Sequence, residues 1–151
     1  IAAPDTSGEV VVNHVGLCVT DLERSRDFYT DVLGFAVDRE LTVPDQASAA
    51  LLAVEPPVGL TAVYLVRGSF TLELLHFDRP GNPLAADRPF NQPGLTHLSF
   101  SVDDLDAAIA LVDDRGGEVV TLLPGMAAVV RDPDGQLLEL LPMSYRATLE
   151  A

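Results

Sequence analysis

Positive charge is scarce in this chain of 151 residues, which has 9 lysine and arginine residues against 23 aspartate and glutamate residues. The formal net charge is therefore −14 at pH 7. A field of this sign repels phosphate backbones and anionic headgroups, so the composition argues against nucleic acid and against a membrane surface as partners. A small-molecule substrate is the expected partner.

Cysteine is nearly absent as well. Cys18 is the single cysteine, so no disulfide can form within the chain, and a reducing cytoplasm is the expected compartment. No positively charged segment followed by an apolar one begins the sequence. The most apolar window, residues 47–66, is interrupted by Glu55, Pro56 and Pro57, so it is not expected to span a bilayer.

What the chain does contain is an internal repeat. His14 lies 83 positions before His97, and the same spacing separates further matched pairs: Val19 and Val102, Asp21 and Asp104, Leu22 and Leu105, and Gly34 and Gly117. A chain of this length suits one compact domain or two small halves that share a core. The repeat favours two related halves.

Each half is predicted to contain a strand, a helix and then three strands. Expected strands of the first half are residues 10–20, 35–43, 60–67 and 70–77, with a helix between Asp21 and Gly34 and a short helix after Asp45. Expected strands of the second half are residues 96–102, 118–122, 126–131 and 136–141, with a helix over 104–115 and a hairpin turn at 132–135. The predicted organisation is a flexible arm (1–9), a first module (10–77), a linker (78–94), a second module (95–142) and a tail (143–151).

Strand alternation gives the two repeated histidines a common setting. His14 shares one face of its strand with Gly16 and Cys18, and His97 shares a face with Ser99 and Ser101. A large polar group beside small neighbours suits the wall of a cavity. A single histidine on a strand is more often structural, but two in the same register favour a shared function.

The last strand of each half adds a carboxylate within an apolar run. Glu73 lies in FTLELLHF and Glu139 in GQLLELLP, and a buried carboxylate is costly unless it is paired or binds a metal. Exposure at a sheet edge is the alternative for either glutamate alone. Together, His14, Glu73, His97 and Glu139 are the predicted ligands of one divalent metal ion (Zn, Ni, Co, Mn or Fe). His76 lies three residues after Glu73, so alternation places it on the opposite face, as a packing or surface residue.

Three segments carry a resemblance to a known family: NHVGLCVTDLERSRDFYTDVLGF, GLTHLSFSVDDLDAAI and RDPDGQLLELLP. With these, the chain resembles the vicinal oxygen chelate superfamily of glyoxalases, bleomycin-resistance proteins and dioxygenases from about Val11 to Pro142. The resemblance implies an α+β fold of two tandem βαβββ modules that form a curled mixed sheet around a metal cup. It also implies that the ligands come from the first and last strands of the modules, at His14, Glu73, His97 and Glu139.

The resemblance implies a glyoxalase-I-like lyase or isomerase, which acts on a small oxygenated carbon acid through a metal-stabilised enolate with Glu139 or Glu73 as base. An Fe(II) extradiol-type dioxygenase and a non-catalytic binding protein are the alternatives, and Glu73 speaks against the dioxygenase. Bacterial glyoxalase I has an arginine where this chain has Cys18, which argues against a glutathione substrate.

Several further expectations concern the surroundings of the site. Arginines that could offset the negative charge are Arg39, Arg67, Arg79 and Arg88. The mouth of the cup is expected at residues 42–60 and in the linker at 78–94. A homodimer is expected, with each site built from one chain or from two.

Overall fold

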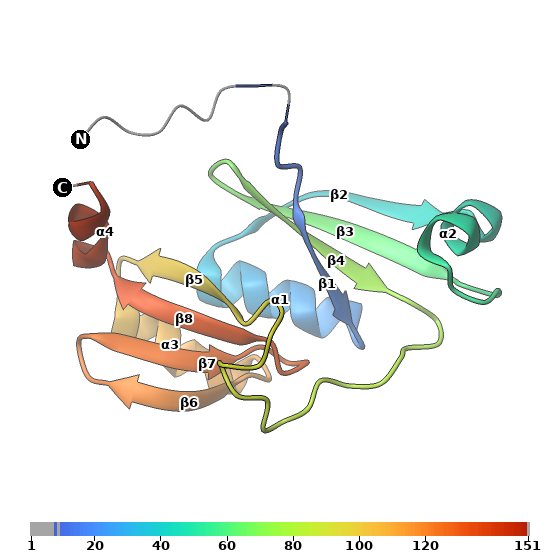
Figure 1. Ribbon diagram of the computed structural model, residues 1–151. Coiled ribbons are helices and arrows are strands. Elements are labelled where there is room, and N and C mark those ends of the chain that lie inside the picture. Colours follow the sequence, from blue (N-terminus) through green and yellow to red (C-terminus); the bar gives the residue numbers. More distant parts are fainter. Residues whose placement is uncertain (1–7, 9, 151) are drawn as a thin grey trace.

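Two four-stranded sheets, joined by a long linker, make up the chain (Figure 1). The computed structural model describes residue 8 and residues 10–150. The first module contains β1 (Val15–Val19), α1 (Leu22–Leu33), β2 (Ala36–Val43), α2 (Asp45–Leu52), β3 (Leu60–Arg67) and β4 (Phe70–His76). The second contains β5 (His97–Val102), α3 (Leu105–Asp114), β6 (Glu118–Leu123), β7 (Ala127–Arg131) and β8 (Leu137–Pro142), and α4 (Ser144–Leu149) follows. The predicted α+β class and the two tandem modules are confirmed.

Strand order is the same in the two modules: β1-β4-β3-β2 in the first sheet and β5-β8-β7-β6 in the second. In each sheet, the first strand of the module pairs in parallel with the last, and the other pairs are antiparallel. The sheets remain separate along the described chain and do not close into one curled sheet. The modules meet through their helices instead, because α1 packs against α3.

The first strand is shorter than the apolar pattern of residues 10–20 predicts. It begins at Val15, so His14 lies one residue before it, and Val10, Val11 and Val12 are exposed. Val15 already pairs with Leu72, close to the start of β4, so earlier residues have almost no neighbouring strand to pair with. The predicted arm at 1–9 lies outside the described residues except for Gly8.

Capping side chains explain where the two long helices begin. The Asp21 carboxylate accepts a hydrogen bond from the backbone N–H of Arg24 at 3.0 Å, and Asp104 does the same for Ala107 at 2.9 Å. Gly34 ends α1 in the left-handed conformation with a φ of 70°, which glycine adopts without steric cost. The predicted helix between Asp21 and Gly34 and the predicted helix start at 104 are confirmed. No helix of the described residues is long and apolar enough to cross a membrane.

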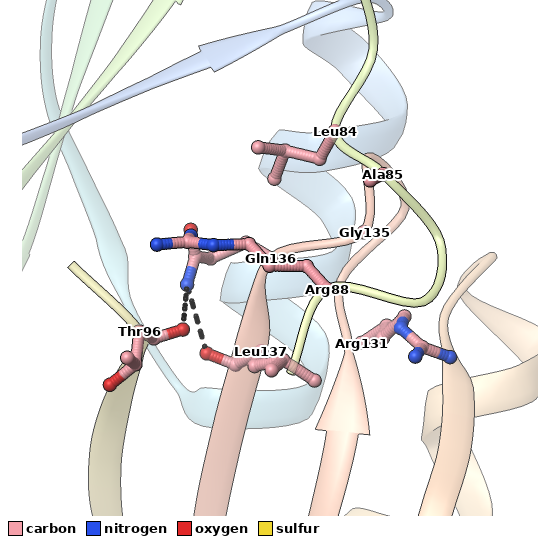
Figure 2. A pocket seen from close by; sticks show the side chains of 8 residues that line it. All are labelled: Leu84, Ala85, Arg88, Thr96, Arg131, Gly135, Gln136 and Leu137. Carbon is pink, nitrogen blue, oxygen red and sulfur yellow. Dashed lines mark hydrogen bonds between the residues drawn. The ribbon is translucent and has the colours of Figure 1, made fainter. Parts of the chain in front are cut away.

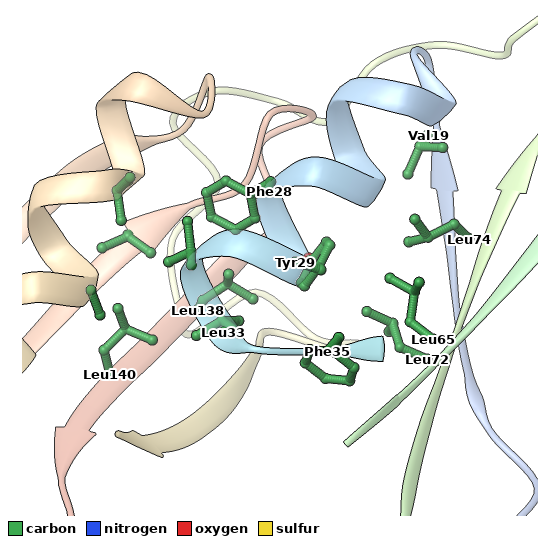
Figure 3. Close-up of a cluster of buried hydrophobic side chains, with 14 of the residues drawn as sticks. Val19, Phe28, Tyr29, Leu33, Phe35, Leu65, Leu72, Leu74, Leu138 and Leu140 are labelled. Carbon is green, nitrogen blue, oxygen red and sulfur yellow. The ribbon is translucent and has the colours of Figure 1, made fainter. Parts of the chain in front are cut away.

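One hydrophobic core is shared by both modules, and Figure 3 shows how α1 connects them. Phe28 and Tyr29 of α1 are fully buried between Leu74 of the first sheet and Leu138 of the second. Burying these large apolar side chains is the main force that holds the modules together.

A polar cluster at the β7–β8 turn reinforces this contact between modules. The Tyr29 hydroxyl donates to the buried Asp132 carboxylate at 2.8 Å, and the Thr20 hydroxyl donates to Asp134 at 2.6 Å. Asp132 also accepts from the backbone N–H groups of Asp134 and Gln136, both at 2.9 Å. The predicted turn at 132–135 is therefore present, and it also ties the second module to the start of α1.

Asp132→Asn is expected to change how stability depends on pH. Burial raises the pKa of Asp132, although hydrogen bonds from Tyr29 and from the backbone of Gln136 and Asp134 act to lower it. The pKa of Asp132 is higher in the folded chain than in the unfolded chain. At pH values between these two pKa values, the native state binds more protons than the unfolded state. The free energy of unfolding therefore falls as the pH rises through this range. The free energy of unfolding of the parent minus that of the variant should therefore decrease as pH rises from about 4. Urea unfolding across the acid range measures it, and an increasing difference would contradict the raised pKa.

Candidate functional site

The two predicted glutamates lie on the sheet faces that the helices do not cover. Leu72 and Leu74 are fully buried on the side of α1, and Glu73 between them points to the opposite face. In β8, Leu138 and Leu140 are buried in the core and Glu139 between them points away in the same manner. Each sheet therefore presents one carboxylate on its uncovered face.

His14 and Glu73 form a close pair on the first sheet. His14 Nε2 lies 2.8 Å from Glu73 Oε2, and the side chains are 36% and 13% exposed. Gly16, the partner of Glu73 on β1, leaves the carboxylate open on that side, since a Cβ there would lie 3.7 Å from Glu73 Oε2. Tyr64 lies on the side of Glu73 that faces β3. A hydrogen bond with the Glu73 carboxylate, partial desolvation of the Tyr64 phenol and the negative charge of Glu73 raise the pKa of Tyr64, whereas the positive charge of Arg39 lowers it.

A cross-strand row extends this pair across the first sheet. Arg39 of β2 is opposite Tyr64 of β3, which is opposite Glu73 of β4. The pairing register shifts between Val37 and Arg39, and such bulges re-aim side chains next to functional sites. The Arg39 guanidinium carbon lies 4.4 Å from the centroid of the Tyr64 ring, and a pocket of about 370 Å³ is lined by His14, Tyr64 and Arg39 among others.

On the second sheet, His97 and Glu139 occupy the equivalent register positions, and each has a different hydrogen-bond partner. The Ser99 hydroxyl donates to Glu139 Oε1 at 2.7 Å, and the two residues are register partners on β5 and β8. His97 Nδ1 lies 2.8 Å from the Thr96 hydroxyl, so Nε2 is the nitrogen left for another partner. The Phe90 ring of the linker lies 5.2 Å from the His97 ring.

The linker closes over the start of β5 (Figure 2). Leu84, Ala85 and Arg88 line a pocket there, and the Gln136 amide donates to the carbonyl oxygens of Thr96 and Leu137, both at 3.1 Å. The pocket has a volume of about 10 Å³, which accommodates at most a water molecule. It is therefore too small for a substrate, and it lies where the linker packs against the start of β5.

The four predicted ligands do not converge within one chain. His14 and Glu73 belong to the first sheet and His97 and Glu139 to the second, and no group of three or more His, Cys, Asp or Glu side chains in residues 8 and 10–150 could hold a metal ion. Each pair offers one imidazole and one carboxylate, which is half of a four-ligand set for a divalent transition metal. These four donors fit a divalent metal when His14 and Glu73 meet a copy of His97 and Glu139. The metal-ligand and base assignments of these residues stay predictions.

Other sequence expectations about the site have different outcomes. The segment 42–60 does not border the His14 pair, because β2 and β3 lead to α2 at the opposite end of the sheet: Thr61 pairs with His76, and His76 with Val19.

Burial and the negative charge of Asp134 raise the pKa of the Cys18 thiol, so it remains protonated at neutral pH and is not an activated nucleophile.

A model of the Glyoxalase/Bleomycin resistance protein/Dioxygenase superfamily matches residues 11–140. The chain belongs to this superfamily. It is 31% identical to Uncharacterized protein YaeR of Escherichia coli, over 85% of this chain and 93% of YaeR. It is 30% identical to the mitochondrial methylmalonyl-CoA epimerase of Mus musculus, over 65% of this chain and 49% of the mouse protein. The trypanothione-dependent glyoxalase I of Leishmania major superposes with a TM-score of 0.62 at 27% identity, over 91% of each chain.

In this glyoxalase-superfamily chain, a candidate site residue carries no signal in the sequence. Tyr64 sits in an ordinary apolar strand pattern, LTAVYLVR, and only the pairing of β3 with β4 places it beside Glu73. Ser99 was expected on the face of His97, but its hydrogen bond to Glu139 depends on the β5–β8 register. Cross-strand register is therefore the information that strand alternation alone lacked.

Proposed function

We propose that this chain is a metal-dependent isomerase or lyase that removes a proton from carbon next to a carbonyl, and that each active site forms between two chains. The observation that carries the proposal is the presence of one His/Glu pair on the uncovered face of each sheet. His14 and Glu73 of one chain would hold the metal together with His97 and Glu139 of a second chain. The named activities of the superfamily relatives, an epimerase and a glyoxalase I, support this reaction class.

The uncovered faces support the homodimer because they carry exposed apolar side chains on their edge strands, β2 and β6. Leu41 is 42% exposed and belongs to the row next to that of Glu73, and Leu123 is 52% exposed in the equivalent row next to Glu139. Covering such side chains with a second copy would remove apolar surface from water. The same association would bring the first pair of one chain to the second pair of the other.

The chain's own residues divide the work within such a site. A bound divalent metal would supply Lewis-acid stabilisation of negative charge on the substrate oxygens. Glu73 is paired with His14 at 2.8 Å and lies opposite Tyr64 in the β3–β4 register, so it is suited to remain a ligand. Glu139 is held by the Ser99 hydroxyl alone among the described side chains, so it is the carboxylate that moves more easily to take the substrate proton.

Subunit complementation tests the site between two chains. One chain carries His14→Ala and Glu73→Ala, and the other carries His97→Ala and Glu139→Ala. Neither homodimer should hold metal, whereas a mixed dimer, isolated with two different affinity tags, regains one complete set of four ligands. We expect about half of the parent's metal content and half of its rate of deuterium incorporation into methylmalonyl-CoA, measured by mass spectrometry.

His76→Ala is the matched control, because His76 lies on β4 but pairs with Val19, away from the His14 end of the sheet. It should keep the parent's metal content. A mixed dimer without metal would show that the ligands come from one chain or from other residues. Oxygen uptake with catechol under Fe(II) would replace the isomerase proposal with the dioxygenase alternative. Tight binding of methylmalonyl-CoA without proton exchange would favour a binding protein.

A further inference from the structure

Cationic groups suited to bind an anionic substrate are few in this chain, which contains no lysine. Arg115 is held by Asp31 at 2.7 Å. Arg131 is held by Glu118 at 3.1 Å and by the Ala86 carbonyl oxygen. Arg39 has no comparable partner among the described residues, because its ion pair with Asp38 is long, at 3.9 Å, and exposed. Such pairs contribute little, so the Arg39 guanidinium remains open to a ligand.

Arg39 also lies on the same face as the His14 pair. The row Arg39, Tyr64 and Glu73 crosses three adjacent strands on the uncovered face of the first sheet. The guanidinium stacks on the Tyr64 ring at 4.4 Å, and the His14 ring meets the same phenol edge-on at a centroid distance of 5.7 Å. Arg39 and His14 therefore both contact the Tyr64 ring, and all three residues line one pocket of about 370 Å³.

The second module has no counterpart to this cation. Its equivalent row consists of Thr121, Val129, Glu139 and Ser99. The two sheets thus share a carboxylate at the equivalent register position, whereas a charged group at the far end of the row occurs in the first module alone. An asymmetry of this kind is expected where one end of a substrate differs from the other.

We propose that Arg39 binds a carboxylate of the substrate that lies beyond the chelating oxygens, an inference that rests on the proposed metal site. The planar guanidinium offers parallel N–H donors that match a carboxylate, and stacking on Tyr64 holds this fork in place. A local cation is needed because a protein with a net charge of −14 repels anions. The substrate class is therefore a carbon acid with vicinal oxygens at one end and a free carboxylate at the other.

Two kinds of hydroxamate test this assignment on Zn²⁺-loaded protein by isothermal titration calorimetry. Acetohydroxamate presents two chelating oxygens alone, whereas the monohydroxamates of succinate and glutarate add a carboxylate on spacers of two lengths. We expect one of the carboxylated probes to bind the parent at least about tenfold more tightly than acetohydroxamate. Arg39→Gln should abolish this preference and leave the affinity for acetohydroxamate unchanged.

Arg146→Gln is the matched control, since it removes the same charge from the exposed helix α4, and it should keep the preference. Equal affinity for all three probes in the parent, or a preference that survives Arg39→Gln, would overturn the role of Arg39 while leaving the chelating site intact. Absence of acetohydroxamate binding to metal-loaded parent would instead overturn the proposed metal site, and the Arg39 proposal with it.

Discussion

Glu139→Gln is expected to lower the rate of deuterium exchange from solvent into the carbon-acid substrate by roughly 100-fold or more, the usual scale for loss of a general base. Glutamine keeps an oxygen that can face the metal and accept the Ser99 hydrogen bond, but it cannot take up the proton. We therefore expect the variant to retain most of its metal. Mass spectrometry of the substrate after incubation in D₂O measures the exchange, and elemental analysis measures the metal.

Glu73→Gln is the comparison that assigns the base. Because Glu73 is already paired with the ligand His14, Glu73→Gln should weaken metal binding more than Glu139→Gln does. Ser99→Ala should keep exchange above that of Glu139→Gln, since it removes only the hydrogen bond to the base. If Glu139→Gln and Glu73→Gln both exchange protons at the parent rate, neither glutamate is the base and the isomerase proposal loses its mechanism.

Gly117→Ala is expected to destabilise the fold strongly. A Cβ at Gly117 would lie 2.5 Å from the Arg131 carbonyl oxygen, 2.7 Å from Phe28 Cε2 and 2.9 Å from Val112 Cγ1. The backbone contact cannot be relieved by rotating a side chain, and Phe28 and Val112 are fully buried. Overpacking of this kind costs about 3 kcal/mol in the free energy of unfolding, which urea denaturation measures.

Gly81→Ala is the control for the intrinsic difference between glycine and alanine, because no atom lies within 4 Å of a Cβ placed there. Its free energy of unfolding should stay within about 0.5 kcal/mol of the parent, as for most surface substitutions. Equal stability of the two variants would show that β6 and α3 can separate at Gly117 without cost, contrary to the packing described above.

Local rules of chain geometry explain what could be read from the sequence. The caps at Asp21, Asp104 and Gly34 depend on residues within one helical turn, and they are present as predicted. The alternation of Glu73 with Leu72 and Leu74 depends only on the two-residue period of a strand. The internal repeat extended these readings from one module to the other. The repeat did not reveal that matched residues can differ in role: Gly34 ends a helix, whereas Gly117 allows close packing.

Contacts between residues far apart in the chain decided the rest. The extent of β1 depended on where β4 begins, and the environment of Glu73 depended on the β3–β4 register, which brings Tyr64 beside it. The placement of the modules depended on α1 packing between the two sheets and on the hydrogen bond between Tyr29 and Asp132, which are 103 residues apart. By itself, the sequence determined two equivalent His/Glu pairs. Only the tertiary structure separated them onto two uncovered faces, because burial of Phe28 and Tyr29 joins the modules through their helices and not through their strand edges.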